Sequence, residues 1–161
     1  MSTLSDLLER FRRGPELVAA VMTGAAGAEL DFAPAPDRWS IRQIVAHLAD
    51  SEIVCADRLR RVIAEENPTL MAFDQNAWTA NLNYARRKIS ESLDTFRRLR
   101  AENYNLLKDL PEAAFARTGT HSQRGLVTLG QLVEGIAGHP ERHARQLEDL
   151  RRQYKQMKAR A

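Results

Sequence analysis

Residues 39–48 read WSIRQIVAHL, a stretch with the features of the first turns of an amphipathic helix. Ser40 can accept a hydrogen bond from the backbone at the helix N-terminus, and Gln43 can return one to the backbone of Ser40, which together make a capping box. Trp39 precedes the cap, where an apolar side chain packs on the first turns as a hydrophobic staple. Residues 127–136 read VTLGQLVEGI and repeat this arrangement. The sequence therefore predicts two helices that begin in the same way.

Apolar residues at helical spacing extend outward from these two starts over most of the chain. No stretch shows the sustained two-residue alternation of a half-buried strand, so we expect an all-α fold. The expected long helices cover residues 4–30, with an interruption near Pro15, and residues 40–66, 83–110 and 128–158. A further helical turn is expected at residues 73–79, between the second and third long helices. This organisation predicts an antiparallel four-helix bundle with a long crossover connection.

Length and composition favour a single globular domain over residues 1–161. Charged residues make up 28% of the chain and the hydrophobic set 43%, a balance typical of folded proteins. No apolar stretch approaches the ~20 residues that span a bilayer, and the N-terminus has no apolar secretion signal, so we expect a cytoplasmic protein without a membrane partner. Cys55 is the only cysteine, which excludes an internal disulfide and a thiolate-rich metal site. Any metal ligands must therefore be histidines or carboxylates.

Positive charge is concentrated at the C-terminal end of the chain. The net charge is +3 at pH 7, and residues 142–161 contain seven arginines or lysines against two acidic residues. Cations in the last turns of a helix interact favourably with its dipole, which accounts for this segment without a nucleic acid. No recognised nucleic-acid-binding motif accompanies the segment, so a nucleic-acid partner is not expected.

Three histidines are spaced so that they can share one metal ion. His139 and His143 are four residues apart in the expected fourth long helix, which places both imidazoles on one helix face. His47 lies in the expected second helix, and an antiparallel partner can bring it opposite this pair. Three imidazoles leave coordination positions open, as in catalytic zinc sites. The spacing alone is a weak signal, because two exposed histidines and one hydrogen-bonded core histidine would show the same pattern.

A resemblance to a known family strengthens the metal-site interpretation. The sequences WSIRQIVAHLADSE, at residues 39–52, and GHPERHARQL, at residues 138–147, resemble motifs of the DinB family and its YfiT-like metalloenzymes. The resemblance implies a four-helix bundle that binds nickel, zinc or a similar ion through the same three histidines. One position departs from the family, because Pro140 stands where relatives often have a polar residue. A proline inside a helix removes a backbone hydrogen bond, so we expect a kink or restart between the two ligands of this helix.

Other residues close to His47 are candidates for a catalytic role. Asp50 and Glu52 lie within about a turn of His47, where a carboxylate can orient a ligand imidazole or act as a base. Arg58 shares the helix face of His47 and could receive an anionic group of a substrate. For each of these three residues, an ordinary surface side chain is the alternative. Gln146 lies one turn beyond the last histidine and could support its imidazole.

Three further residues are interpreted as structural. His121 lies in a connection with turn chemistry, where a local hydrogen bond is commoner than a place in a pocket. Cys55 is interpreted as a core residue rather than a nucleophile. Trp78 is interpreted as packing the crossover over one end of the bundle.

The resemblance also implies a metal-dependent enzyme that acts on a small molecule. Relatives with known activity include thiol transferases, which use the ion to acidify a low-molecular-weight thiol such as bacillithiol, and a mycothiol-dependent isomerase. An open metal position can activate a thiol or a water, so we expect a thiol S-transferase, with a thiol cosubstrate, or a hydrolase. The alternative is a stress-associated, non-enzymatic binding module whose metal is structural or vestigial. In both cases we expect a homodimer.

Overall fold

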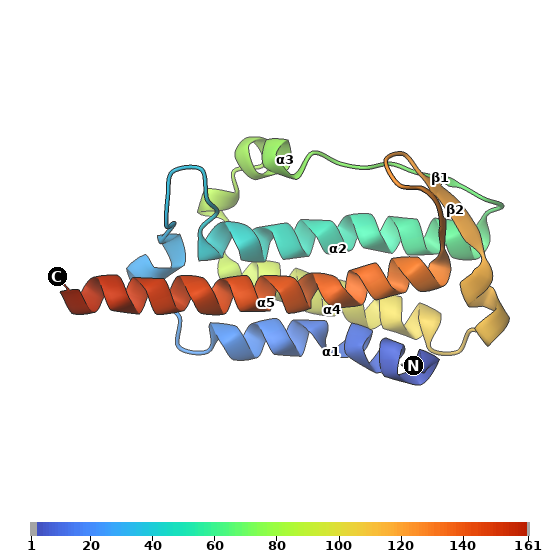
Figure 1. Cartoon of the computed structure of the whole chain (residues 1–161), viewed down its shortest axis with the longest axis horizontal. Coiled ribbons are helices and arrows are strands. Elements are labelled where there is room, and N and C mark those ends of the chain that lie inside the picture. Colours follow the sequence, from blue (N-terminus) through green and yellow to red (C-terminus); the bar gives the residue numbers. More distant parts are fainter. Residues whose placement is uncertain (1–2, 161) are drawn as a thin grey trace.

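The four-helix bundle with a long crossover is confirmed by the computed structural model, which describes residues 3–160 (Figure 1). The helices are α1 (Leu4–Met22), α2 (Ile41–Ala64), α3 (Gln75–Asn81), α4 (Ile89–Leu107) and α5 (Leu129–Arg160). The strands are β1 (Thr69–Leu70), β2 (Thr118–His121) and β3 (Gly125–Thr128), and short 3-10 helices lie at η1 (Gly27–Asp31), η2 (Tyr84–Arg86) and η3 (Glu112–Ala116). Within the described part of the chain, no helix is long and apolar enough to cross a membrane.

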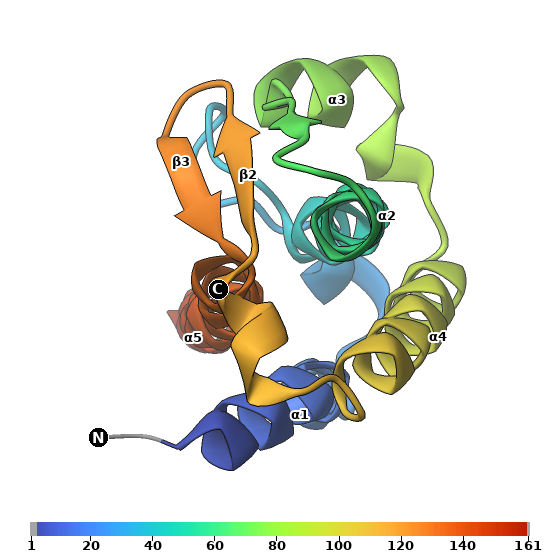
Figure 2. The same ribbon diagram turned by 90° about the vertical axis from the view of Figure 1, so that its right-hand side faces the viewer.

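The long helices α1, α2, α4 and α5 form the bundle, which Figure 2 shows nearly end-on. α1 packs against α4 and α5, and α2 packs against the same two helices. The crossover between α2 and α4 returns along the bundle, so these two helices run parallel (Figure 1). α2 and α5 run antiparallel, as the sequence predicts, and this pairing places His47 opposite the N-terminal half of α5.

Both predicted capping boxes form. Ser40 Oγ accepts a hydrogen bond from the backbone N–H of Gln43 at 3.3 Å, and Gln43 Oε1 accepts one from the N–H of Ser40 at 2.8 Å. Thr128 and Gln131 make the same pair of bonds at 3.1 and 2.9 Å. The sequence therefore fixes the start, and with it the rotational setting, of the two helices that carry the histidines.

Two predicted helix boundaries are wrong. α1 ends at Met22 rather than at residue 30, because the chain turns at Gly24 and Gly27, whose φ angles are 76° and 58°. α4 begins at Ile89 rather than at residue 83, because Asn83 has a φ of 53° and breaks the helical path. Apolar side chains that follow each turn still pack on the bundle. The apolar spacing of the sequence therefore continues across both turns and gives no sign of the helix boundaries.

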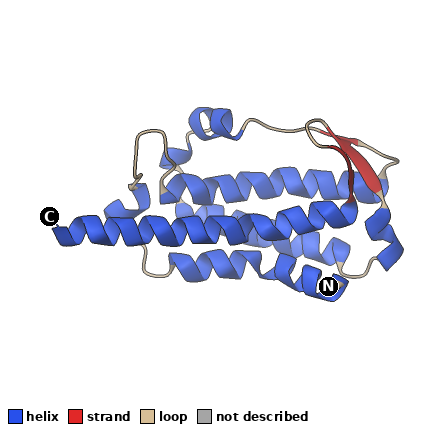
Figure 3. Cartoon of the chain, in the orientation of Figure 1, coloured by secondary structure: helices blue, strands red, loops and turns tan. Residues whose placement is uncertain are grey.

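A small three-stranded sheet lies beside α2 and α5 near one end of the bundle, and the sequence pattern did not predict it (Figure 3). β1 pairs in parallel with β2, with Leu70 opposite His121, and β2 pairs antiparallel with β3. The strands are two to four residues long, which is too short to show an alternating pattern. The segment expected to contain turns is therefore a hairpin, with Gly125 at a φ of 71°. Its pairing with β1 ties the crossover to the segment that precedes α5.

The two helices that contain prolines continue through them. α1 includes Pro15 and α5 includes Pro140, so the interruption expected at Pro15 and the restart expected at Pro140 are wrong, while the alternative of a kink at Pro140 stays a prediction. Each proline frees the carbonyl four residues earlier from its helical hydrogen bond. Both freed carbonyls accept from the guanidinium of Arg100: Phe11 O at 2.7 Å and Ile136 O at 3.5 Å. Arg100, a buried residue of α4, thus donates to both carbonyls that the prolines leave without a helical partner.

Apolar side chains fill the bundle in two clusters. The cluster near the sheet includes Leu59 and Leu132, and the cluster at the other end includes Ile44 and Leu147. The level between them is polar and contains Arg100 and other buried polar side chains. Each cluster contains side chains from several helices. Apolar packing therefore stabilises the bundle on both sides of the polar level.

Candidate metal centre

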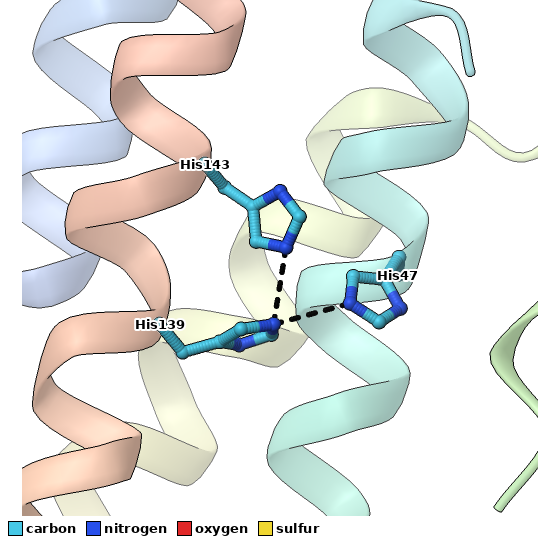
Figure 4. A group of neighbouring side chains, drawn as sticks. All are labelled: His47, His139 and His143. Carbon is cyan, nitrogen blue, oxygen red and sulfur yellow. Dashed lines mark hydrogen bonds between the residues drawn. The ribbon is translucent and has the colours of Figure 1, made fainter. Parts of the chain in front are cut away.

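Three histidines from two antiparallel helices converge between α2 and α5 (Figure 4). His47 projects from α2, and His139 and His143 project toward it from successive turns of α5. His139 Nε2 lies 3.1 Å from Nε2 of His47 and 3.1 Å from Nε2 of His143. One ring nitrogen from each residue lies within 4.8 Å of the other two, an arrangement that could hold one metal ion. The structure therefore brings together the three side chains that the sequence selected.

Burial keeps these imidazoles neutral. His47 is 2% exposed, and burial, followed by the proximity of His143, lowers its pKa to about 3. Burial likewise lowers the pKa of His139 to about 2, with His143 the next largest influence. The pKa of His143 is also lowered, again mainly by burial. A neutral imidazole is the form that offers a lone pair to a metal ion.

The three neutral rings cannot satisfy one another's hydrogen bonds. The Oε1 atom of Gln146 accepts from His143 Nδ1 at 2.9 Å, which leaves a lone pair on Nε2 of that ring. His139 Nε2 faces two ring nitrogens and has at most one hydrogen to donate. Bonds of roughly 2.0–2.1 Å to zinc hold two donor nitrogens about 3.3 Å apart at the tetrahedral angle, close to the 3.1 Å that separates His139 Nε2 from each of the other two rings. The donor set and its spacing therefore fit a divalent ion.

Aromatic side chains pack around the histidine of α2. The ring centroid of Trp39 lies 4.9 Å from that of His47, and the centroid of Phe73, in the crossover, lies 6.4 Å away. Phe73 also packs on Trp78 of α3, with centroids 4.6 Å apart. The crossover thus provides apolar cover for the centre, which controls its access to solvent. The sequence predicts packing roles for both tryptophans but gives no signal for Phe73, because its connection has no regular spacing.

A cavity of about 200 Å³ opens beside His47 and His139. Phe73, Leu132 and Ile136 give it an apolar wall, and α2, α5, the crossover and the β2–β3 hairpin all contribute to its lining. A small molecule in this cavity would lie next to the ring nitrogens of two of the three histidines. The arrangement therefore places a candidate metal centre beside a space for a small molecule.

Two of the three catalytic candidates lie outside this cavity. Asp50 accepts hydrogen bonds from Arg87 at 2.6 and 3.1 Å and from the hydroxyl of Tyr84 at 2.8 Å. Glu52, which is 2% exposed, accepts from Arg100 at 2.9 and 2.7 Å. The two carboxylates join α2 to the end of the crossover and to α4. The structure does not bring them together with the three histidines.

The third catalytic candidate, Arg58, does line the cavity, and its guanidinium donates to the carbonyl of Met71. His121 makes a local hydrogen bond, in which its Nδ1 accepts from the N–H of Gln123 at 3.2 Å, but it lines the cavity as well. Cys55 also borders the cavity, and burial raises the pKa of its thiol to about 12. That thiol is neutral at ordinary pH and is a poor nucleophile.

Two further arginines of the cavity wall were not candidates in the sequence analysis. Arg124 comes from the β2–β3 hairpin, and Arg142 comes from α5. Nothing in the sequence pattern places Arg124, because the hairpin itself was not predicted. Arg142 could have been found, since it lies three residues after His139 and such residues are neighbours on a helix surface.

This chain is similar in sequence to bacterial proteins that are named as metal-dependent hydrolases. It is 29% identical over 147 residues to a "putative metal-dependent hydrolase" of Oceanobacillus iheyensis, a match that covers 91% of this chain and 85% of the relative. It is 27% identical over 148 residues to the "putative metal-dependent hydrolase" YfiT of Bacillus subtilis, which covers 91% of this chain and 82% of the relative.

The fold is shared with a solved structure. YfiT from Bacillus subtilis, described as "a probable metal-dependent hydrolase with an unusual four-helix bundle topology", matches with a TM-score of 0.87 at 23% sequence identity. The match covers 94% of this chain and 87% of that chain. The sequence model of the DinB superfamily matches residues 10–147, which are most of the chain. The protein therefore belongs to the DinB superfamily.

Proposed function

We propose that this protein is a metal-dependent hydrolase of a small molecule, in which His47, His139 and His143 bind one divalent ion. The observation that carries the proposal is the convergence of three neutral imidazoles beside a cavity. Imidazole ligands suit zinc and nickel, which are the ions we propose. A divalent ion on three neutral ligands keeps its full charge, and it supplies Lewis acidity and acidifies a bound water or thiol. The names of the relatives agree with hydrolysis.

The neighbouring residues of the chain have supporting roles in this proposal. Gln146 fixes the orientation of the His143 ring through its hydrogen bond to Nδ1. Ser51 Oγ lies 3.3 Å from the His47 ring and restricts its rotation. Phe73, Leu132 and Ile136 give the substrate side an apolar surface, which strengthens the electrostatic interactions next to it. Asp50 and Glu52 take no part in the reaction here, because arginines already occupy both carboxylates.

Metal analysis of purified variants tests the ligand assignment. Replacing His47 with alanine, or His139 and His143 together, should abolish stoichiometric binding of zinc or nickel. His121→Ala is the matched control, because His121 borders the same cavity without belonging to the convergent set. Equal loss of metal in the control and in the ligand variants would show that the centre is misassigned.

An activity screen then tests the reaction type. The metal-loaded protein would be offered small esters, amides and phosphate esters and, separately, a low-molecular-weight thiol with an electrophilic acceptor. Hydrolysis that disappears on chelation and returns with zinc or nickel would support the proposal. Turnover only with the thiol would replace hydrolase by thiol S-transferase. A metal-loaded protein inactive in both screens, whose chelation unfolds it, would favour a binding module with a structural ion.

A further inference from the structure

Arg58 differs from the other interior arginines of the described chain because neither a carboxylate nor a helix C-terminus balances its charge. Seven arginines in the described chain are buried or half-buried. Five of them pair with carboxylates, namely Arg10, Arg42, Arg87, Arg100 and Arg151. A sixth, Arg117, donates to two carbonyls at the C-terminal end of α2, where the helix dipole is negative. Arg58 donates only to the carbonyl of Met71.

The guanidinium of Arg58 also has an unused donor. Its Nε–H is buried and has no hydrogen-bond partner within the described chain. A buried N–H without a partner is uncommon in native proteins and requires an explanation, such as a water, an ion or a ligand. The carbonyl of Met71 is neutral and cannot balance the charge. Within the described chain, neither the charge nor the Nε–H of Arg58 is therefore satisfied, whereas Glu52 balances the charge of Arg100.

The cavity that Arg58 borders carries an excess of positive charge. None of its lining residues is an aspartate or a glutamate, whereas the solvent-exposed Arg124 and Arg142 add two further cations. His121 adds a donor, because its Nδ1 accepts from the backbone and the ring hydrogen is then on Nε2. Within a partly apolar wall, unbalanced positive charge of this kind attracts an anion.

The size of the cavity limits what this anion can be. Its volume is about 200 Å³. That space is of a size to hold a small organic molecule. Phe73 and Ile136 offer it an apolar surface, and the guanidinium of Arg58 matches the planar oxygens of a carboxylate or the oxygens of a phosphate.

We propose that the substrate of this site is a small organic anion whose carboxylate or phosphate group binds Arg58. The body of the molecule lies against Phe73 and Ile136, and its reacting bond is directed to the three histidines. The reaction assumed here rests on the proposed function, but the anion site itself does not require the metal. Arg58 is thus a specificity-determining residue, which selects the substrate by its charged end.

Anion titration of metal-free protein tests the site without relying on turnover. Chelated protein would be titrated with inorganic phosphate and, separately, with acetate, by calorimetry and by NMR of the arginine Nε–H signals. Saturable binding that shifts the Arg58 signal is expected, and the stronger of the two anions identifies the group that the site prefers. Arg58→Gln should weaken binding at least tenfold, because it removes a charge-assisted interaction.

Arg98→Gln is the matched control, because Arg98 is an exposed residue of α4 that does not line the cavity. It removes the same charge from the protein and should change anion affinity less than twofold. Arg58→Lys keeps the charge and should retain more affinity than Arg58→Gln. Equal weakening by the Arg58→Gln and Arg98→Gln variants, or no saturable binding to the metal-free protein, would overturn the inference.

Failure of this inference and failure of the proposed function give different results. Anion binding that appears only after zinc is added, and that is equal in wild type and Arg58→Gln, would place the anion on the metal and reject the Arg58 site alone. Anion binding that depends on Arg58 in a protein that never takes up metal would reject the proposed hydrolase and keep the anion site. Arg58→Gln should retain the metal stoichiometry of wild type, which shows that the variant is folded.

Discussion

Replacing Arg100 with methionine should destabilise the protein more than any change confined to the cavity wall. Arg100 is 1% exposed, and its Nε and Nη2 atoms donate to Glu52 at 2.9 and 2.7 Å. The same guanidinium donates to the two carbonyls that Pro15 and Pro140 free from their helices. It also lies 4.4 Å from the ring centroid of Phe11. One side chain therefore links four helices.

The expected magnitude follows from what Arg100→Met leaves behind. Glu52 would remain as a buried carboxylate with only Asn103 as a donor, at 2.9 Å. Removal of one partner from a buried ion pair costs about 3–5 kcal/mol. Each carbonyl left without a donor adds about 1–3 kcal/mol, so the free energy of unfolding should fall by about 5–11 kcal/mol. This loss is comparable with the whole stability of a typical domain, about 5–15 kcal/mol.

Urea denaturation followed by circular dichroism of four proteins would measure the effect: wild type, Arg100→Met, Glu52→Met and the double variant. Replacing both partners of a buried pair with apolar side chains is close to neutral for the pair itself, so the double variant should regain about 3 kcal/mol relative to Arg100→Met. It should remain less stable than wild type, because the two carbonyls still lack a donor. A cost below about 1 kcal/mol for Arg100→Met, or a double variant no more stable than that single variant, would refute the reasoning.

The remaining predictions concern packing, pH and the metal. Gly14→Ala should lower the free energy of unfolding by about 1–3 kcal/mol, measured by urea denaturation, because the new Cβ would lie 2.7 Å from both Pro140 and Arg100. Burial lowers the pKa of His47 to about 3, whereas a histidine of the unfolded chain has a pKa of ~6.5. As the pH falls from ~6.5 toward about 3, His47 is protonated in the unfolded chain but not in the folded one, so metal-free protein should lose stability. For His47 the loss at pH 4.5 should be about 2.7 kcal/mol, and a His47→Gln variant with the same pH dependence as wild type would contradict this. Chelation should leave most of the helical circular dichroism signal, because the apolar clusters do not depend on the ion, and cooperative loss of helix would instead make the ion structural.

The parts that the sequence predicted are those with a local signal. Two capping boxes and helical spacing fix α2 and α5 within a residue or two of their ends, and the four-residue spacing of two histidines fixes their common face. At 100° per residue, Arg58 lies about 20° around α2 from His47, whereas Glu52 lies about 140° away. Helix geometry alone therefore favours Arg58 over Glu52 as a neighbour of the centre. A shared helix face therefore predicts a residue beside the centre better than closeness to His47 in the sequence does.

The parts that the sequence did not predict depend on partners that are distant along the chain. Asp50 is close to the face of His47, but Arg87 and Tyr84, which follow the crossover, hold its carboxylate. The strands are short and exist because they pair with one another, so they leave no periodic pattern. Pro15 looks like a helix break, yet its helix continues because a buried arginine satisfies the freed carbonyl. In each case a tertiary contact overrides the local preference.

The contrast between Arg100 and Arg58 indicates that the bundle uses one buried arginine to stabilise the fold and leaves another available to a ligand. Arg100 is balanced by Glu52 of α2 and also donates to Ile136 of α5, so it joins the two helices that carry the histidines. This link holds the three ring nitrogens near one another without a metal, so less conformational freedom is lost when an ion binds. Arg58 borders the same cavity with its charge unbalanced and one donor unused. A charge that the protein itself does not neutralise remains available to a ligand, whereas one neutralised inside the bundle stabilises the fold.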